Sequence, residues 1–310
     1  MGELELIAAI KAALGPAPAR VLTGPGDDAA VVRADAVLAT STDTVVDGVH
    51  FSLSTHSPAD VGHKALATAL SDIAAMGAGP GEAYVALVMP PHFGGALELV
   101  EGMRELAARH GVALAGGDVV SGPVLAITVT VTGWSGAADR LVYRSGARPG
   151  DIVGVTGELG GSGAGLRLLE SGESPPERDA LVSRHRRPEP LLATGLALAA
   201  VGVSAMIDVS DGVATDAGHL AAASGALIEI HLADLPLAAG VESASFAATA
   251  GDDYELLFTA PPDRRAAIER AAAATGTRVS WLGDVRPGGG LVEIRGPDGR
   301  LVDLRGFEHA

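Results

Sequence analysis

The sequence predicts a protein of the α/β or α+β class, in which mixed sheets are flanked by helices. Its 310 residues are enough for one large or two ordinary domains, and 47% of them are hydrophobic, which allows a sizeable core. Segments typical of strands and of helices alternate along the chain, and this alternation favours layered domains. No fixed-period repeat is present, which argues against a solenoid or a propeller.

The first half begins with an amphipathic N-terminal helix and continues with alternating elements. Apolar runs predict strands over 37–41, 84–89, 112–115 and 124–134, and helical periodicity predicts helices over 60–76 and 95–110. The stretch 135–150 contains Ser145-Gly146 and Pro149-Gly150, which are turn formers, so we expect it to join two domains. The expected domains are residues 1–136 and 137–310.

The second half starts with a strand over 152–156 and a glycine-rich turn. Helices are expected over 164–169, 176–184, 191–200, 214–224 and 263–275. Strands are expected to end at Ile207 and to cover 227–231 and 254–259, with short strands near the C-terminus.

The composition limits the partners of this chain. Its formal net charge is −16 and its only lysines are Lys11 and Lys64, so nucleic acid and anionic membranes would repel it. The N-terminus lacks the basic start and cleavage site of a signal peptide, and polar and glycine residues interrupt the longest apolar stretch, 191–207. With no cysteine, disulfides, thiolate nucleophiles and cysteine-type zinc sites are excluded. We expect a cytoplasmic enzyme that binds neither nucleic acid nor membrane.

Familiar nucleotide-binding and hydrolase motifs are missing. The chain has no Gly-Lys-Ser/Thr, His-Arg-Asp, His-Glu-x-x-His or Gly-x-Ser-x-Gly. The glycine-rich run Gly157 to Gly165 does not fit G-x-G-x-x-G, which argues against a Rossmann dinucleotide site. The run has two possible roles, a flexible linker or a loop that exposes N–H groups to phosphate.

Aspartate beside glycine or serine recurs instead. The clusters are GDD (26–28), STD (41–43), SD (71–72), GGD (116–118), DVSDG (208–212) and GDD (251–253). Any single cluster is also typical of ordinary turns and helix caps. Several of them follow apolar runs, however, and carboxylates at the carboxyl ends of strands can converge. Converging carboxylates repel each other by roughly 4 kcal/mol per pair unless cations bridge them.

Hard oxygen ligands favour magnesium, manganese or calcium. Magnesium takes one or two carboxylates together with phosphate oxygens, so several ions would hold a polyphosphate in this acidic protein.

The same residues, taken in order, resemble the motifs of thiamine-monophosphate kinases, which belong to the aminoimidazole ribonucleotide synthetase superfamily. The resemblance covers nearly the whole chain. The matching stretches are GPGDDAAVV (24–32), STDTVVDGVHF (41–51), GHKALATALSDIAAMGAGP (62–80), GGDVVSGP (116–123), YRSGARPGDIVGVTGELGGSGAGL (143–166), RHRRPEP (184–190), IDVSDGVATDAGHL (207–220) and GDDYELLF (251–258).

This resemblance implies the fold, the cofactors and the site. The fold would be the two-domain aminoimidazole ribonucleotide synthetase-like fold. Its N-terminal domain would bind metal and ATP and form a homodimer, and its C-terminal domain would complete the nucleotide and substrate site. The implied ligands of several Mg²⁺ ions are Asp28, Ser41, Thr42, Asp43, Asp72, Asp118, Asp208 and Asp211. The implied ATP contacts are Gly117, Asp118, Arg144 and Ser210, and the implied thiamine monophosphate contacts are His50, Asp252 and Phe307. Asp43, Arg144 and Asp211 would be catalytic.

Two departures and three alternatives accompany these assignments. The family commonly has Gly-Glu-Asp where this chain has Gly251-Asp252-Asp253, and Phe307 lies in a short tail. The alternative for His50 is that it only caps the turn before Phe51, and the alternative for Arg144 is that it is a solvated loop cation. The basic run 184–187 resembles a solvated face more than a nucleotide site.

The implied reaction moves the γ-phosphoryl group of ATP onto thiamine monophosphate. The second pKa of a phosphate monoester is about 6, so the attacking oxygen is already anionic at neutral pH and needs no general base. Direct in-line transfer is therefore expected. The alternatives are another ATP-dependent enzyme of the superfamily, such as an aminoimidazole ribonucleotide synthetase or a hydrogenase maturation dehydratase, and an acidic calcium-binding module. The chain has no EF-hand loop and no cysteine of the kind that selenophosphate synthetases use.

Overall fold

The computed structural model describes residues 3–16, 18–23, 30–34 and 36–306. The chain divides into two compact units. Unit 1 comprises Met1–Ile73 and Gly79–Ala138, and unit 2 comprises Ala74–Ala78 and Asp139–Ala310. No helix in the described ranges is both long and apolar enough to cross a membrane.

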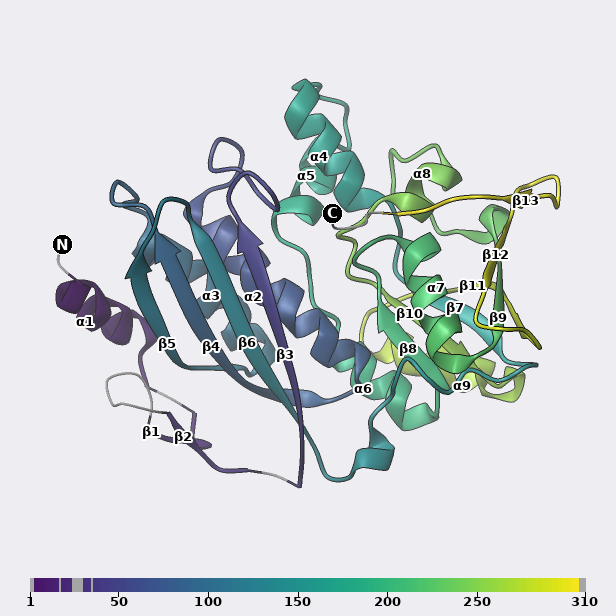
Figure 1. Cartoon of the computed structure of the whole chain (residues 1–310), viewed down its shortest axis with the longest axis horizontal. Helices are drawn as coiled ribbons and strands as arrows, with labels where there is room; N and C mark the ends of the chain where they lie inside the picture. The colour runs from purple at the N-terminus through teal and green to yellow at the C-terminus, as the bar shows by residue number, and fades with distance from the viewer. Residues whose placement is uncertain (1–2, 17, 24–29, 35, 307–310) are drawn as a thin grey trace. The chain divides into compact units, whose positions relative to one another are not determined.

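Unit 1 is a four-stranded sheet with helices on one face (Figure 1). Its helices are α1 (Glu3–Leu14), α2 (Pro58–Ala75) and α3 (Ala96–His110), and its strands are β1 (Val21–Thr23), β2 (Val31–Val32), β3 (Val37–Val46), β4 (Gly79–Met89), β5 (Ala113–Ser121) and β6 (Ala126–Ser135). The strand order is β3-β6-β4-β5, in which β4 and β5 are parallel and the other neighbours are antiparallel. β1 and β2 form a separate two-stranded ribbon.

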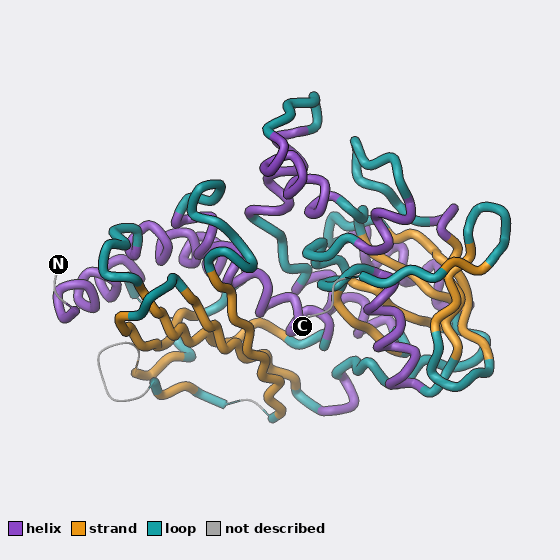
Figure 2. Tube along the Cα trace, turned by 45° about the horizontal axis from the view of Figure 1, so that its top comes forward, coloured by secondary structure: helices purple, strands orange, loops and turns teal. Residues whose placement is uncertain are grey.

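Alternation along β3 and β6 separates the two faces of this sheet. Ile127, Val129 and Val131 of β6 are fully buried beneath the helices, and the residues between them are threonines. Figures 1 and 2 both show α2 and α3 on one face of the sheet, while no helix in the described part of unit 1 covers the other face. We call this second face the open face.

The two covering helices pack unusually closely, at two glycines. A Cβ atom on Gly62 of α2 would overlap the Leu99 carbonyl oxygen of α3, and one on Gly102 of α3 would overlap the Ala59 carbonyl oxygen of α2. This contact fixes α2, which carries Asp72, relative to α3.

Unit 2 contains a seven-stranded mixed sheet with helices around it. The helices are η1 (Ala138–Arg140, at the junction of the units), α4 (Gly161–Ser171), α5 (Arg178–Arg186), α6 (Leu192–Val201), α7 (Val213–Ser224), η2 (Leu232–Asp234), α8 (Ala244–Thr249), η3 (Pro262–Arg264) and α9 (Arg265–Ala274). The strands are β7 (Ile152–Thr156), β8 (Ala205–Asp208), β9 (Leu227–His231), β10 (Leu256–Ala260), β11 (Val279–Arg286), β12 (Val292–Arg295) and β13 (Leu301–Val302).

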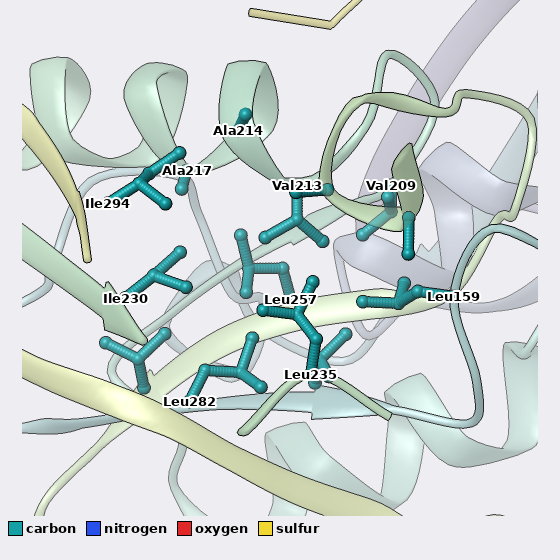
Figure 3. Packing of buried hydrophobic residues seen from close by; sticks show 14 of the residues in the cluster. Leu159, Val209, Val213, Ala214, Ala217, Ile230, Leu235, Leu257, Leu282 and Ile294 are labelled. Carbon is teal, nitrogen blue, oxygen red and sulfur yellow. The ribbon is translucent and has the colours of Figure 1, made fainter. Parts of the chain in front are cut away.

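The strand order in unit 2 is β13-β12-β9-β11-β7-β10-β8, and only β12 and β9 pair in parallel. The core between this sheet and α7 includes Leu159, Val209, Val213, Ala217, Ile230, Leu257 and Leu282 (Figure 3). Mixed sheets flanked by helices confirm the predicted fold class. The predicted bounds of β7 and β9 are correct, whereas β3 and β5 are longer than predicted and α8 was not predicted.

Candidate functional site

In unit 1, two carboxylates and a serine lie together between β3 and α2. Ser41 and Asp43 share the helix-covered face of β3, as their cross-strand partners Val131 and Val129 show. The Ser41 hydroxyl donates a hydrogen bond to Asp72 Oδ2. Burial, together with the negative charge of Asp72, raises the pKa of Asp43 to about 6.

The Thr42 side chain lies on the face of the sheet opposite to Ser41 and Asp43. This is the open face, where the hydroxyls of Thr42 and Thr130 are 2.9 Å apart. The next pair of threonines on this face, Thr44 and Thr128, has hydroxyls 2.8 Å apart. The Thr42 side chain is therefore separated from Asp43 and Asp72 by the sheet, and only its main chain could serve a metal beside Asp43.

Asp118 lies at the opposite edge of the same sheet. It pairs with Ala86 of β4, which pairs with Thr128 of β6, so Asp118 belongs to the open face and is three strands from β3. At the usual strand spacing this separation is about 14 Å. The expectation that Asp43 and Asp118 follow strand ends is wrong, because β3 and β5 each continue past them.

Gly117 and His50 each have a local structural role. A Cβ atom on Gly117 would overlap the Val85 carbonyl oxygen, so β4 and β5 can approach here only with glycine. His50 Nδ1 accepts a hydrogen bond from the Val46 N–H at 3.2 Å, in the turn after β3. The ring therefore caps the turn, and in its neutral form carries its proton on Nε2.

In unit 2, two predicted clusters are brought together. Asp208 ends β8, one residue beyond the predicted end at Ile207, and the loop that follows pairs with the segment before β10. The Ser210 carbonyl oxygen accepts from the Asp252 N–H at 2.8 Å, and the Val209 carbonyl oxygen accepts from the Tyr254 N–H at 2.8 Å. These bonds place Asp208, Ser210 and Asp211 beside the segment that carries Asp252.

The segment that carries Asp252 has an uncommon backbone conformation. Asp252 and Tyr254 have φ values of 65° and 52°, in the left-handed region that side chains other than glycine rarely adopt. The buried Tyr254 hydroxyl donates to Asp252 Oδ1 at 2.9 Å, which orients the carboxylate.

Sequence reasoning missed a third carboxylate beside this loop. Asp216, in the first turn of α7, is only 1% exposed, and its Oδ2 accepts from the Asp211 N–H at 3.1 Å. Burial and the charges of Asp208 and Asp211 raise the pKa of Asp216 to about 8. Asp211, Asp216 and His219 each offer a ligand atom within 4.8 Å of the others. The signal was present in the sequence, as an acidic residue just inside a helix whose preceding loop already held two aspartates.

The glycine-rich run is neither a linker nor an open loop. It forms the start of α4, and Asp253 accepts hydrogen bonds from the N–H groups of Gly160 at 2.6 Å and Ser162 at 3.1 Å. These groups are therefore occupied by a carboxylate of the chain itself. Burial raises the pKa of Asp253 to about 6 and that of the neighbouring Glu255 to about 7, while Thr156 donates to Glu255 at 2.6 Å.

The basic residues have different surroundings. The exposed Arg144 lies beside the C-terminal end of α7, because its carbonyl oxygen accepts from the Ser224 hydroxyl at 3.1 Å. Asp211 precedes the other end of this 12-residue helix, about 18 Å away. In the run 184–187, Arg184 pairs with Glu158 at 2.8 Å and His185 is buried, so the expectation of a solvated face is wrong.

Asp28 and Phe307 lie outside the described residues.

Comparison with known proteins adds independent evidence. Residues 26–135 match the family model of the AIR synthase related protein, N-terminal domain, and residues 148–295 match that of the C-terminal domain. The thiamine-monophosphate kinase of Escherichia coli K12 is 37% identical over 322 residues, covering 99% of this chain and 98% of the relative.

Two solved structures agree with this relationship. The crystal structure of thiamine-monophosphate kinase from Stenotrophomonas maltophilia K279a superimposes with a TM-score of 0.86 at 34% identity, covering 97% of this chain and 98% of the other. AaThiL complexed with AMPPCP and TMP gives a TM-score of 0.79 at 32% identity, covering 100% of this chain and 97% of the other. On fold, motifs and identity over its whole length, the chain belongs to the thiamine-monophosphate kinase family, among the AIR synthase related proteins.

Proposed function

We propose that the chain is an ATP-dependent kinase that phosphorylates thiamine monophosphate to thiamine diphosphate with the help of several Mg²⁺ ions. The observation that carries this proposal is full-length similarity to a relative solved with an ATP analogue and TMP. The other superfamily activities that the sequence left open are not favoured, because the relatives compared above are thiamine-monophosphate kinases. Location in the cytoplasm stays a prediction from the sequence.

The donor sets of both units fit a hard divalent cation. In unit 1, Ser41, Asp43 and Asp72 offer only oxygen ligands, and burial together with the neighbouring Asp72 raises the pKa of Asp43. In unit 2, Asp208 and Asp211 lie beside a third carboxylate, Asp216. Oxygen donors of this kind favour Mg²⁺, which when bound would neutralise the phosphate oxygens of ATP. Asp28, Thr42 and Asp118 remain proposed ligands from the family resemblance.

The residues of the chain would act by positioning rather than by proton transfer. The attacking oxygen belongs to a phosphate monoester and is already anionic at neutral pH. Asp252, oriented by Tyr254, and His50, whose ring is fixed by the Val46 N–H, are proposed to hold thiamine monophosphate together with Phe307. Gly117, Asp118, Arg144 and Ser210 remain proposed ATP contacts from the family resemblance, although Arg144 lies at the end of α7 opposite to Asp211. We therefore propose direct in-line transfer without a phosphoenzyme.

A homodimer formed through unit 1 is part of the proposal. Residues 1–136 would be the dimerisation, metal and ATP domain, and residues 137–310 would add nucleotide and substrate contacts. The open face supports a partner, because Leu38 and Val120 are 48% and 47% exposed on it. A Thr130→Arg variant should be monomeric by light scattering at micromolar concentration, whereas the unmodified chain should be dimeric.

One assay tests the activity. The purified chain is incubated with ATP, MgCl₂ and thiamine monophosphate, and thiamine diphosphate and ADP are quantified. Equimolar formation of both products is expected, and none should form with formylglycinamidine ribonucleotide as the acceptor. ADP release with that compound, but not with thiamine monophosphate, would show that the chain is another enzyme of the superfamily.

A further inference from the structure

The loop of residues 208–212, which we call the β8–α7 loop, is fixed to its surroundings on two sides. Its carbonyl groups bond to the segment before β10, as described above, and the Val209 N–H donates to the Glu255 carbonyl oxygen at 2.8 Å. Val209 and Val213 are 0% and 1% exposed and point into the core (Figure 3). Gly212 has a φ of 99°, and a Cβ atom there would lie 2.9 Å from the Thr249 carbonyl carbon. The loop therefore has little freedom on these sides.

Two more N–H groups of the loop, those of Ser210 and Asp211, are directed to one buried side chain. Asp216 accepts from the Asp211 N–H at 3.1 Å, and the Ser210 N–H also hydrogen-bonds to its carboxylate. N–H groups before and at a helix start have no partners within the helix, and the helix dipole favours an anion there. Asp216 therefore holds the two peptide units from which the Ser210 and Asp211 side chains project.

We infer that Asp216 is a positioning residue, which holds the β8–α7 loop so that Asp208 and Asp211 present their carboxylates to the metal. The inference rests on the proposed magnesium-dependent function. It assigns Asp216 an acceptor role toward N–H groups, for which an amide oxygen is as suitable as a carboxylate oxygen. If Asp216 were instead a metal ligand with Asp211 and His219, its negative charge would be indispensable. The two roles thus predict opposite results for an Asn substitution.

The test compares Asp216→Asn and Asp216→Ala with Asp211→Asn. Binding of Mn²⁺ is measured by electron paramagnetic resonance in the presence of AMPPCP, and the Mg²⁺ dependence of thiamine diphosphate formation is measured alongside. Loss of an outer partner of a ligand commonly weakens metal binding about 10- to 100-fold, and we expect this range for Asp216→Ala. The KM for thiamine monophosphate should not change. Asp216→Asn should restore most of the Mn²⁺ affinity, whereas Asp211→Asn should not bind the ion tightly.

A matched control separates positioning from helix capping alone. Asp60 likewise lies in the first turn of a helix, α2, where its carboxylate accepts from the Ser57 N–H at 3.1 Å. Asp60→Ala should lower the melting temperature without changing Mn²⁺ affinity. Equal affinity in Asp216→Ala and the unmodified chain, or a loss in Asp216→Asn as large as in Asp211→Asn, would overturn the inference alone. An unmodified chain that bound no Mn²⁺ with AMPPCP would overturn the proposed function as well.

Discussion

Thr42 and Asp43 are neighbours in β3, yet their side chains lie on opposite faces of the sheet. We expect Asp43→Asn to lower kcat by at least about 100-fold, because a charge that would contact the metal is lost. Thr42→Val should stay close to the unmodified chain, since any metal contact from Thr42 would use its main chain. Steady-state measurement of kcat for the two variants tests this difference between Asp43 and Thr42. A large kcat loss in Thr42→Val with an unchanged melting temperature would contradict the assignment of faces.

The Tyr254 hydroxyl donates a hydrogen bond to Asp252 and so sets the direction of the Asp252 carboxylate. Removing the hydroxyl in Tyr254→Phe deletes a hydrogen bond to a charged group, worth roughly 1.5–3 kcal/mol, about a 10- to 100-fold effect. We expect the KM for thiamine monophosphate to rise by this factor and the KM for ATP to stay unchanged. Tyr143→Phe, at an exposed tyrosine, is the control and should not alter either constant. Equal changes in both KM values would indicate a general disturbance of unit 2.

Residue identity was sufficient to find many site candidates but not their directions. The chemistry of aspartate beside small residues identified Asp43, Asp72, Asp208 and Asp211 as potential cation ligands. It could not reveal that residues 252 and 254 are left-handed, because the three loop-crossing hydrogen bonds that impose this conformation come from residues about 45 positions away. The role of Asp216 was not predicted for a similar reason. A single aspartate in a helix gives no sign of a special role until its hydrogen-bond partners in the loop are known.

The packing of α2 on α3 depends on two glycines at close backbone contact. Gly62→Ala places a methyl group on the Leu99 carbonyl oxygen, so we expect at least about 2 kcal/mol of destabilisation despite the better helix propensity of alanine. Gly94→Ala is the matched control, because nothing lies within 4 Å of its Cβ position, and it should change stability by less than about 0.5 kcal/mol. Urea unfolding measures both. Similar midpoints for the two variants would mean that the helices can separate without cost.

The lengths of β3 and β5 explain why the predicted strand ends were misplaced. Polar runs such as Ser41-Thr42-Asp43 and Gly116-Gly117-Asp118 are typical of turns, so the sequence pattern predicted that each strand ends there. In the structure each polar run continues a strand, because its main chain still pairs with β6 or β4. Tertiary pairing thus overrides local preference at positions that are proposed to bind metal and ATP. β7 and β9 were predictable, since both are apolar runs bounded by turn residues.

Buried carboxyl groups should make the stability of the metal-free chain decrease as the pH rises. Glu255 has a pKa of about 7 when folded, against 4.5 when unfolded, because burial disfavours its charge. As pH rises above 4.5 the unfolded chain loses this proton first, so the contribution of Glu255 to the free energy of unfolding decreases until about pH 7 and is then constant. The Glu255 contribution is about 3 kcal/mol at most. Asp253, with a pKa of about 6, acts in the same direction.

Urea unfolding in EDTA at pH 5, 6, 7 and 8 would measure this decrease. Glu255→Gln keeps an acceptor for the Thr156 hydroxyl but cannot ionise, so its stability should depend less on pH between 5 and 7. The exposed Glu242→Gln is the matched control and should retain the slope of the unmodified chain. A stability that rose with pH over this range in EDTA would refute the account of these buried groups.

The order of strands in unit 2 also has a consequence for synthesis of the chain. β11 lies between β9 and β7, and Val279 of β11 pairs with Thr156 of β7, roughly 120 residues earlier. During synthesis, β7, α4 to α7 and β9 therefore leave the ribosome long before β11, the strand that pairs with both β7 and β9, has been made. The sheet of unit 1 needs nothing beyond β6, so it can form early, and β7 can pair with β10, but β9 stays unpaired until β11 emerges. The interval before Val279 emerges is when a nascent chain would most need a chaperone, and a message truncated there would yield a folded first half joined to an aggregation-prone second half.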